Sequence, residues 1–383
     1  MHGRAADRAA RRPAGEPVSA GFDVRLATAA DEPDIRALVG SVAMPGAVAL
    51  RFAREPDYYL GTTIMGDPCD VIVGRRRADG ALAGIACRAQ RPAFVNGEET
   101  QLGYVGQIRI AAPFRGRGLV ARGARLLRER TPAGMLSFGV VARDNPRAAA
   151  TLVGRRLPAG LRVARVAGLT TCAILLRPRR TVRPAGLDVH PATAESLPEV
   201  VAFLRAEGRR RQFFPAYTVA DFADGLALRG LAPEDVLLAR RGRRIVGTLA
   251  VWDQSAFKQD VVEAYGPGLR RLRPLYDLVA RLLGARPLTP PGQAIALAFA
   301  ACVCVAADDA NVARALVSAG AAAAHARGKA FLMLGLADHD PLLPVARKFL
   351  HVPYRSDLYA LSWSDDPAQR LDGRVPYVEI ATL

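Results

Sequence analysis

The sequence predicts two tandem α+β domains, and three observations lead to this fold class. The chain has 383 residues, which matches two domains of about 100–200 residues each. Half of the residues are hydrophobic, which is enough for two packed cores. One order of strands and helices occurs twice along the chain. No uncharged apolar run reaches the roughly 20 residues of a membrane span, so we expect none.

The internal repeat defines the elements of each half. A strand pattern at residues 22–28 leads into a helical pattern at 30–39, and the same unit recurs at 186–193 and 195–204. In both halves there follow two strands joined by a basic turn, then a long strand, a helix, a further strand and a short helix. Each half ends in closing strands. A repeat of this length indicates duplicated domains rather than a solenoid.

The repeat and the composition give the domain boundaries. Arg, Ala, Pro and Gly dominate the first residues without an apolar signal core, which predicts a disordered tail. Proline and arginine mark a linker between the halves. The predicted segments are a disordered basic tail at 1–21, an N-terminal domain at 22–178, a linker at 179–185 and a C-terminal domain at 186–383.

The second half carries an insertion at residues 257–292. Residues 269–283 within it have apolar positions at helical spacing. We expect that apolar face to pack on the rest of the protein, and covering a pocket is the alternative.

The formal charge of +17 comes almost entirely from arginine, since only Lys258, Lys329 and Lys348 are lysines among 53 basic residues. The arginines are spread along the chain instead of forming one basic segment. Nucleic acid is therefore not the expected partner, although it stays as a third hypothesis.

Five cysteines show neither a zinc pattern nor a redox pair. Cys302 and Cys304 share one face of an apolar strand, which predicts core packing. We expect no metal site and a reducing, cytoplasmic compartment.

The segment from Ile108 to Gly123 carries the chemistry. A strand runs to Ile110, a loop with two Arg-Gly pairs follows, and a helix continues to about residue 130. The first amides of a helix lack intrahelical partners and the helix dipole adds positive charge, so this place suits an anion. Glycines allow close approach of a phosphate. The pattern predicts a diphosphate site, with a plain surface turn as the alternative.

Residues 115–120, Arg-Gly-Arg-Gly-Leu-Val, resemble the signature Arg/Gln-x-x-Gly-x-Gly/Ala of the GNAT superfamily of N-acyltransferases, with Val120 departing at the last position. The resemblance implies that each domain is a mixed, mostly antiparallel sheet flanked by helices, and that acetyl-CoA or another acyl-CoA is the co-substrate. It places the pantetheine arm on the main chain of Ile108 and Ile110 and the pyrophosphate on the amides of residues 117–120. A second match, Asn145 to Ala148, implies that Asn145 faces the cofactor or caps its helix. The implied cofactor-binding residues are Ile108, Ile110, Arg115, Gly116, Arg117, Gly118, Leu119, Val120 and Asn145.

The resemblance also implies a reaction. An acyl group would pass from acyl-CoA to the amine of a small molecule or peptide by direct transfer in a ternary complex, with an N–H near Ile110 polarising the thioester. The family's usual acid, a tyrosine, is replaced by Leu152. Tyr104 and Gln107 are the catalytic candidates on the long strand, with a packed aromatic as the alternative for Tyr104. Tyr58 and Tyr59 are further candidates for the acceptor site.

The second half departs from the signature. At the matching place it has Asp308 and Asp309 and no glycine loop, so opposed charge predicts that it does not bind coenzyme A. Because of this departure and the missing tyrosine, a protein that binds acyl-CoA or a partner without turnover is the second hypothesis. A homodimer stays open.

Overall fold

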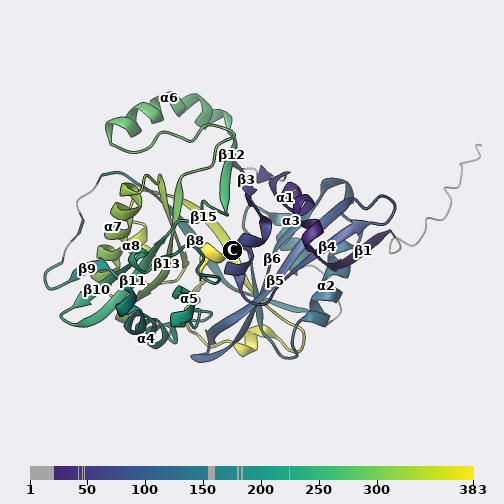
Figure 1. Ribbon diagram of the computed structural model, residues 1–383, viewed down its shortest axis with the longest axis horizontal. Helices are drawn as coiled ribbons and strands as arrows, with labels where there is room; N and C mark the ends of the chain where they lie inside the picture. Colours follow the sequence, from purple (N-terminus) through teal and green to yellow (C-terminus); the bar gives the residue numbers. More distant parts are fainter. Residues whose placement is uncertain are drawn as a thin grey trace, which may run out of the picture.

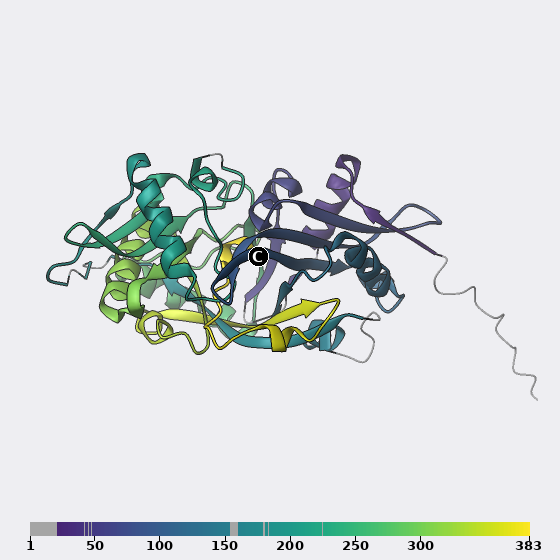
Figure 2. The same ribbon diagram turned by 90° about the horizontal axis from the view of Figure 1, so that it is seen from below.

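The structure is a computed structural model that describes residues 21–41, 43–44, 46, 48–153, 160–178, 181–182, 184–223 and 225–383. Residues 1–20 of the predicted tail lie outside this part of the chain. Two α+β halves lie side by side and share one continuous sheet, with helices on its faces (Figures 1 and 2). None of the helices among the described residues has the length and apolar character of a membrane span.

The first half follows the predicted order. Its strands are β1 (Phe22–Leu26), β4 (Cys69–Arg76), β5 (Leu82–Val95), β6 (Glu98–Ile110), β7 (Ser137–Ala142) and β8 (Arg162–Leu175). Its helices are α1 (Glu32–Ser41), α2 (Leu119–Arg130) and α3 (Pro146–Val153).

The second half repeats this order with one addition. Its strands in the shared sheet are β9 (Asp188–Pro191), β10 (Val236–Arg241), β11 (Arg244–Trp252), β13 (Leu297–Val305), β14 (Phe331–Ala337) and β15 (His351–Ser362). Its helices are α4 (Leu197–Gly208), α5 (Val219–Ala223), α6 (Pro267–Leu282), α7 (Ala310–Ala326) and α8 (Leu343–Ala346). A separate small sheet joins β2 (Ala43–Met44) and β3 (Val48–Ala53) of the first half to β12 (Gln259–Tyr265) of the second.

The halves begin with the same local structure. In the first, the Asp31 carboxylate accepts the Thr28 amide at 2.8 Å and so starts the turn before α1. In the second, the Ser196 hydroxyl accepts the Thr193 amide at 2.9 Å before α4. Short polar side chains satisfy the free amides of a first helical turn, so one sequence pattern produces the same turn twice.

The closing strands are exchanged between the halves. The sheet order is β1-β4-β5-β6-β7-β15-β8-β14-β13-β11-β10-β9, so β15 inserts between β7 and β8 while β8 pairs with β14. The two halves therefore complete one sheet together through these closing strands. The strands themselves form near the predicted positions, but their neighbours come from the other half. All strand pairs of the shared sheet are antiparallel except β6 with β7 and β13 with β14, which confirms the mixed, mostly antiparallel sheet.

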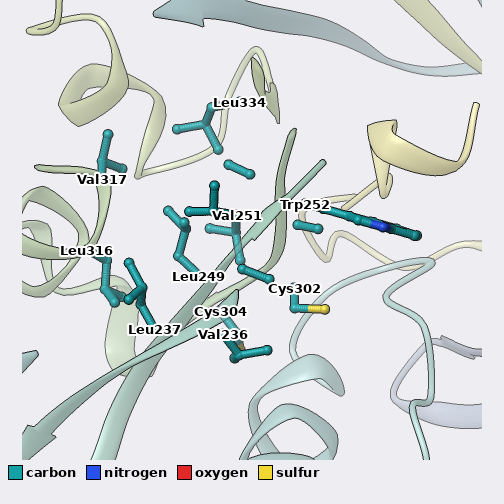
Figure 3. Packing of buried hydrophobic residues seen from close by; sticks show 14 of the residues in the cluster. Val236, Leu237, Leu249, Val251, Trp252, Cys302, Cys304, Leu316, Val317 and Leu334 are labelled. Carbon is teal, nitrogen blue, oxygen red and sulfur yellow. The ribbon is translucent and has the colours of Figure 1, made fainter. Parts of the chain in front are cut away.

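Apolar side chains of β10, β11, β13 and α7 form the core of the second half (Figure 3). Cys302 and Cys304 are buried among them, which confirms their predicted packing role. Trp252 is fully buried, and its indole N–H donates to the Arg229 carbonyl at 2.8 Å, so its one polar atom is satisfied inside the core.

Helix α6 lies in the insertion as predicted, but its apolar face does not pack on the protein. The predicted apolar positions Leu272, Leu275, Leu278, Val279 and Leu282 are exposed. The helix stands apart from both halves at the end of β12 (Figure 1). The expectation of packing is therefore wrong, because helical spacing defines an apolar face without saying what covers it.

Candidate acyl-CoA site

The site begins where β6 and β7 separate. These parallel strands pair at Gly103 with Ser137 and at Tyr104 with Phe138. Beyond that point β6 continues to Ile110 and β7 to Ala142 without further pairing to each other. Two strands that part in this way leave main-chain groups on their facing edges for another partner. We call this opening the first wedge.

The glycine loop lies at the far end of β6. Gly116 and Gly118 have φ of 75° and 78°, a left-handed conformation that glycine adopts without strain. Gly118 is the N-cap of α2 and supplies no side-chain cap. A side chain added at either glycine would meet open space. The first amides of α2 therefore point toward an open surface, as an anion site requires.

The other predicted cofactor residues lie around this loop. Arg115 and Arg117 are exposed, as are Ile108 and Val120, whereas Leu119 is buried and anchors α2. The Arg115 guanidinium donates to the Ile110 carbonyl at 3.3 Å, so this side chain spans from the loop to the strand end.

Of the two roles considered for Asn145, facing the cofactor or capping its helix, the structure shows the capping contact. The Asn145 side-chain oxygen accepts the Ala148 amide at 3.1 Å, at the start of α3. This contact accounts for the Asn-x-x-Ala spacing without a cofactor.

A β-bulge marks the middle of β6. The register between β5 and β6 shifts so that Gln107 and Ile108 together face one residue of β5, and Gln107 has a φ of 53°. The buried side-chain oxygen of Gln107 has no hydrogen-bond partner among the described residues. Such a bulge turns main-chain groups out of the ladder, and it lies on the wedge side of Tyr104.

Tyr104 lies against this bulge. Its ring packs on Phe138 at 5.2 Å between centroids, so the packing role that was the alternative for Tyr104 is present. A Cβ placed on Gly106 would come within 2.0 Å of the Tyr104 hydroxyl, which shows that the hydroxyl covers Gly106, next to Gln107. Burial raises the pKa of Tyr104, so the hydroxyl keeps its proton at neutral pH.

The second half contains the same wedge and fills it. Strands β13 and β14 pair at only three positions and then part, and a bulge again sets two residues, Cys302 and Val303, against one of β11. The Cys302 amide donates to the Glu379 carboxylate at 2.8 Å, and the Val303 amide donates to the Tyr377 hydroxyl at 3.2 Å. The segment around Glu379 thus occupies the second wedge.

The helix that follows this second wedge is capped from within. The Asp309 carboxylate accepts the amides of Asn311 and Val312 at 2.8 and 3.3 Å, at the start of α7. Arg241 pairs with the same carboxylate at 2.7 Å. A fixed carboxylate therefore holds the place where the first half leaves its helix amides open.

The small sheet formed by β2, β3 and β12 lies beside Arg109 of β6. The Arg109 guanidinium lies over the Phe52 ring of β3 at 5.8 Å, and Phe52 is paired with Asp260 of β12. Residues paired in this way project from the same face, so Asp260 lies on the side of the sheet that faces Arg109. One oxygen of Asp260 is buried without a hydrogen-bond partner among the described residues. Arg54 directly follows β3 and is 3% exposed, and its one side-chain hydrogen bond among the described residues goes to the Ala53 carbonyl.

Burial and neighbouring charges shift the pKa values of Asp260 and Lys258 in this sheet. Burial raises the pKa of Asp260 above its ordinary value, with Lys258 and Arg54 opposing the rise. Burial and the neighbouring Arg54 lower the pKa of Lys258 to about 7. Its ammonium donates to the carbonyls of Ala381 and Leu383 at 2.9 and 2.8 Å. These charged groups escaped the sequence analysis because the pairing of β3 with β12 brings them together from distant segments.

The two tyrosines considered for the acceptor site are engaged elsewhere. Tyr58 is buried and its hydroxyl lies 3.0 Å from the Cys87 sulfur. The Tyr59 hydroxyl donates to the Thr28 carbonyl at 2.9 Å. Both hydroxyls therefore already have partners within the first half.

Comparisons with known proteins give the fold a context. No family model and no curated protein matches the sequence. The structure matches Saccharomyces cerevisiae N-myristoyltransferase with bound myristoyl-CoA at a TM-score of 0.59 and 11% identity, over 93% of this chain and 82% of that chain. It matches a GCN5-related N-acetyltransferase from Sphaerobacter thermophilus at a TM-score of 0.55 and 15% identity, over 92% of this chain and 98% of that chain. The chain thus has the fold of these N-acyltransferase structures, as its resemblance to the GNAT superfamily implied.

Proposed function

We propose that the protein is an acyl-CoA-dependent N-acyltransferase whose single acyl-CoA site lies in the first half. The observation that carries this proposal is the contrast between the two halves. In the first half no side chain of the described residues caps the amides at the start of α2, and β6 and β7 part beyond Tyr104. In the second half a carboxylate occupies the equivalent helix start and another lies in the wedge. Internal carboxylates in one copy indicate an anionic and oxygen-bearing ligand for the other.

The repeat also suggests where the thioester carbonyl binds. In the second wedge the amides of Cys302 and Val303 hold oxygen atoms of Glu379 and Tyr377. The equivalent bulge residues of the first wedge are Gln107 and Ile108. We therefore assign the N–H groups of these two residues, rather than one near Ile110, to the carbonyl oxygen and to the oxyanion that forms from it.

The transfer then needs a base and an acid. The acceptor nitrogen attacks the thioester carbon, the tetrahedral intermediate collapses, and the carbon–sulfur bond breaks. Asp260 is the proposed base for the amine proton, because its buried free oxygen and raised pKa suit proton uptake. Tyr104 is the proposed acid, because it retains its proton and lies beside the bulge. Its proton passes to the leaving thiolate and releases coenzyme A as a thiol.

Donor and acceptor are defined only by class. The expected donor is acetyl-CoA, and the N-myristoyltransferase likeness adds myristoyl-CoA as a donor to test. The acceptor is an amine of a small molecule or peptide. A cytoplasmic location fits the supply of acyl-CoA and the free cysteines.

The test is thiol release with acetyl-CoA and with myristoyl-CoA across a panel of amines and peptides. Tyr104→Phe and Asp260→Asn are compared with Tyr265→Phe, a control whose hydroxyl donates to the Thr289 carbonyl. The proposal expects release by the unmodified protein, a loss of at least about 100-fold in kcat for both site variants, and no loss for the control.

The alternative, a binder without turnover, is favoured by Leu152 at the usual tyrosine position and by the departure of the second half from the signature. It expects acyl-CoA binding with no thiol release above background for any amine. That result would remove the enzymatic proposal and keep the binding site.

A further inference from the structure

Helix α6 presents its apolar side to the outside. Five of its apolar residues and their neighbour at the helix end are between 44% and 77% exposed, which is unusual for leucine and valine in one patch. They are Leu272, Leu275, Leu278, Val279, Leu282 and Leu283, which we call the α6 face. At 1.5 Å per residue the helix is about 24 Å long, so the face is an extended stripe.

The opposite side of α6 is already used. The Arg273 guanidinium donates to the Leu288 carbonyl at 3.2 Å, and the Leu288 amide donates to the Asp277 carboxylate at 2.7 Å. The Tyr265 hydroxyl donates to the Thr289 carbonyl at 2.6 Å and ties the base of the insertion. The chain that returns from the helix therefore covers its polar side and fixes the α6 face outward. Figure 1 shows the helix at the outer end of the insertion, away from the shared sheet.

Exposed arginines accompany the apolar side chains of this helix: Arg271 lies next to the α6 face, and Arg270 and Arg281 lie toward the polar side. Arg270, Arg271 and Arg281 have no ion pair in the part of the chain that the structure describes. The acid of the helix, Asp277, is paired with Arg273 at 3.5 Å. An apolar stripe with free arginines on the same helix is the composition of a helix that lies in the plane of an anionic membrane surface.

Charge also weighs against a second copy as the occupant. A second α6 helix brings the same arginines and offers them no free acid, because Asp277, the one acidic residue of the helix, is paired with Arg273. Like charges at that contact oppose association. We propose that α6 is an interfacial helix that docks the protein on an anionic lipid surface, with the leucines among the acyl chains and the arginines at the headgroups.

The test is co-sedimentation of the full chain with phosphatidylcholine vesicles, with and without 30% phosphatidylserine, at two salt concentrations. Binding is expected only with the anionic vesicles and is expected to weaken at high salt. Leu275→Glu with Leu282→Glu should lower partitioning at least about tenfold. Replacing the three free arginines by glutamine should lower it about fivefold per arginine.

Leu226→Glu is the matched control, because Leu226 is 55% exposed but lies outside the insertion. It should bind vesicles as the unmodified protein does. Circular dichroism of each variant checks that the chain is folded, so the test does not depend on acyl-CoA binding, which can fail separately.

Three results would overturn the proposal. One is the absence of vesicle binding by the unmodified protein. Another is equal binding to neutral and anionic vesicles. The third is a dimer in analytical ultracentrifugation that Leu275→Glu dissociates, since the α6 face would then belong to a second copy.

Discussion

Replacement of Gly118 by alanine separates the role of the glycine loop in binding from its role in folding. Gly118 has a φ of 78° and caps α2, and a Cβ at this position meets no atom within 4 Å. The variant is therefore free of clashes, and its folding cost is the strain of alanine in the left-handed region. We expect a loss of about 1–2 kcal/mol in the free energy of unfolding.

The effect on ligand binding should be larger than this strain suggests. The added methyl group occupies the open space from which a phosphate approaches the amides of α2. Loss of one hydrogen bond to a charged group costs about 1.5–3 kcal/mol, so the affinity for acetyl-CoA should fall roughly 10- to 150-fold.

Gly123→Ala is the matched control within the same helix. A Cβ added at Gly123 also meets open space, and Gly123 lies inside α2 without a positive φ. Alanine there should raise the free energy of unfolding by up to about 1 kcal/mol and leave acetyl-CoA affinity unchanged. Titration calorimetry measures the affinities, and urea unfolding measures the stabilities. Equal affinity of Gly118→Ala and the unmodified protein, or equal weakening by both variants, would refute the reasoning.

Three further predictions follow from the exchange of strands and from the buried charges. A fragment of residues 21–178 should show no cooperative thermal unfolding by circular dichroism, because β8 finds its partners in β14 and β15; a sharp transition would contradict the exchange. Glu379→Ala leaves the Cys302 amide without its partner and should lower the free energy of unfolding in urea by about 2–4 kcal/mol. A loss below about 0.5 kcal/mol would contradict the role of Glu379 in filling the second wedge. Burial lowers the pKa of Lys258 from 10.5 to about 7. Between pH 7 and pH 10.5 Lys258 is therefore protonated in the unfolded chain and largely neutral in the folded one, so the free energy of unfolding should rise with pH. Lys258→Met should flatten the rise, which urea unfolding at pH 7, 8 and 9 would detect.

Local patterns account for most of the fold. The repeated unit at residues 22–39 and 186–204, the strand before Ile110 and the glycine loop depend on turn and helix signals that lie within a few residues of each other. The bulge at Gln107 has no such signal, since nothing in its neighbourhood demands a positive φ.

Pairings between distant segments escape the same reasoning. Alternation of apolar residues predicts that β8 and β15 are strands, but does not specify that each joins the sheet of the other half. The approach of Asp260 to Phe52 likewise depends on a pairing across more than half of the chain. Helical spacing identified the apolar face of α6, and only the structure shows which side the returning segment covers.

The stoichiometry of acyl-CoA binding tests the central claim most directly. Titration calorimetry with acetyl-CoA should give one site per chain, because Asp309 and Glu379 fill the helix start and the wedge of the second half, whereas no side chain of the described residues caps α2 in the first. Two sites per chain would contradict the assignment of the second half, and no binding at high micromolar acetyl-CoA would contradict the site itself.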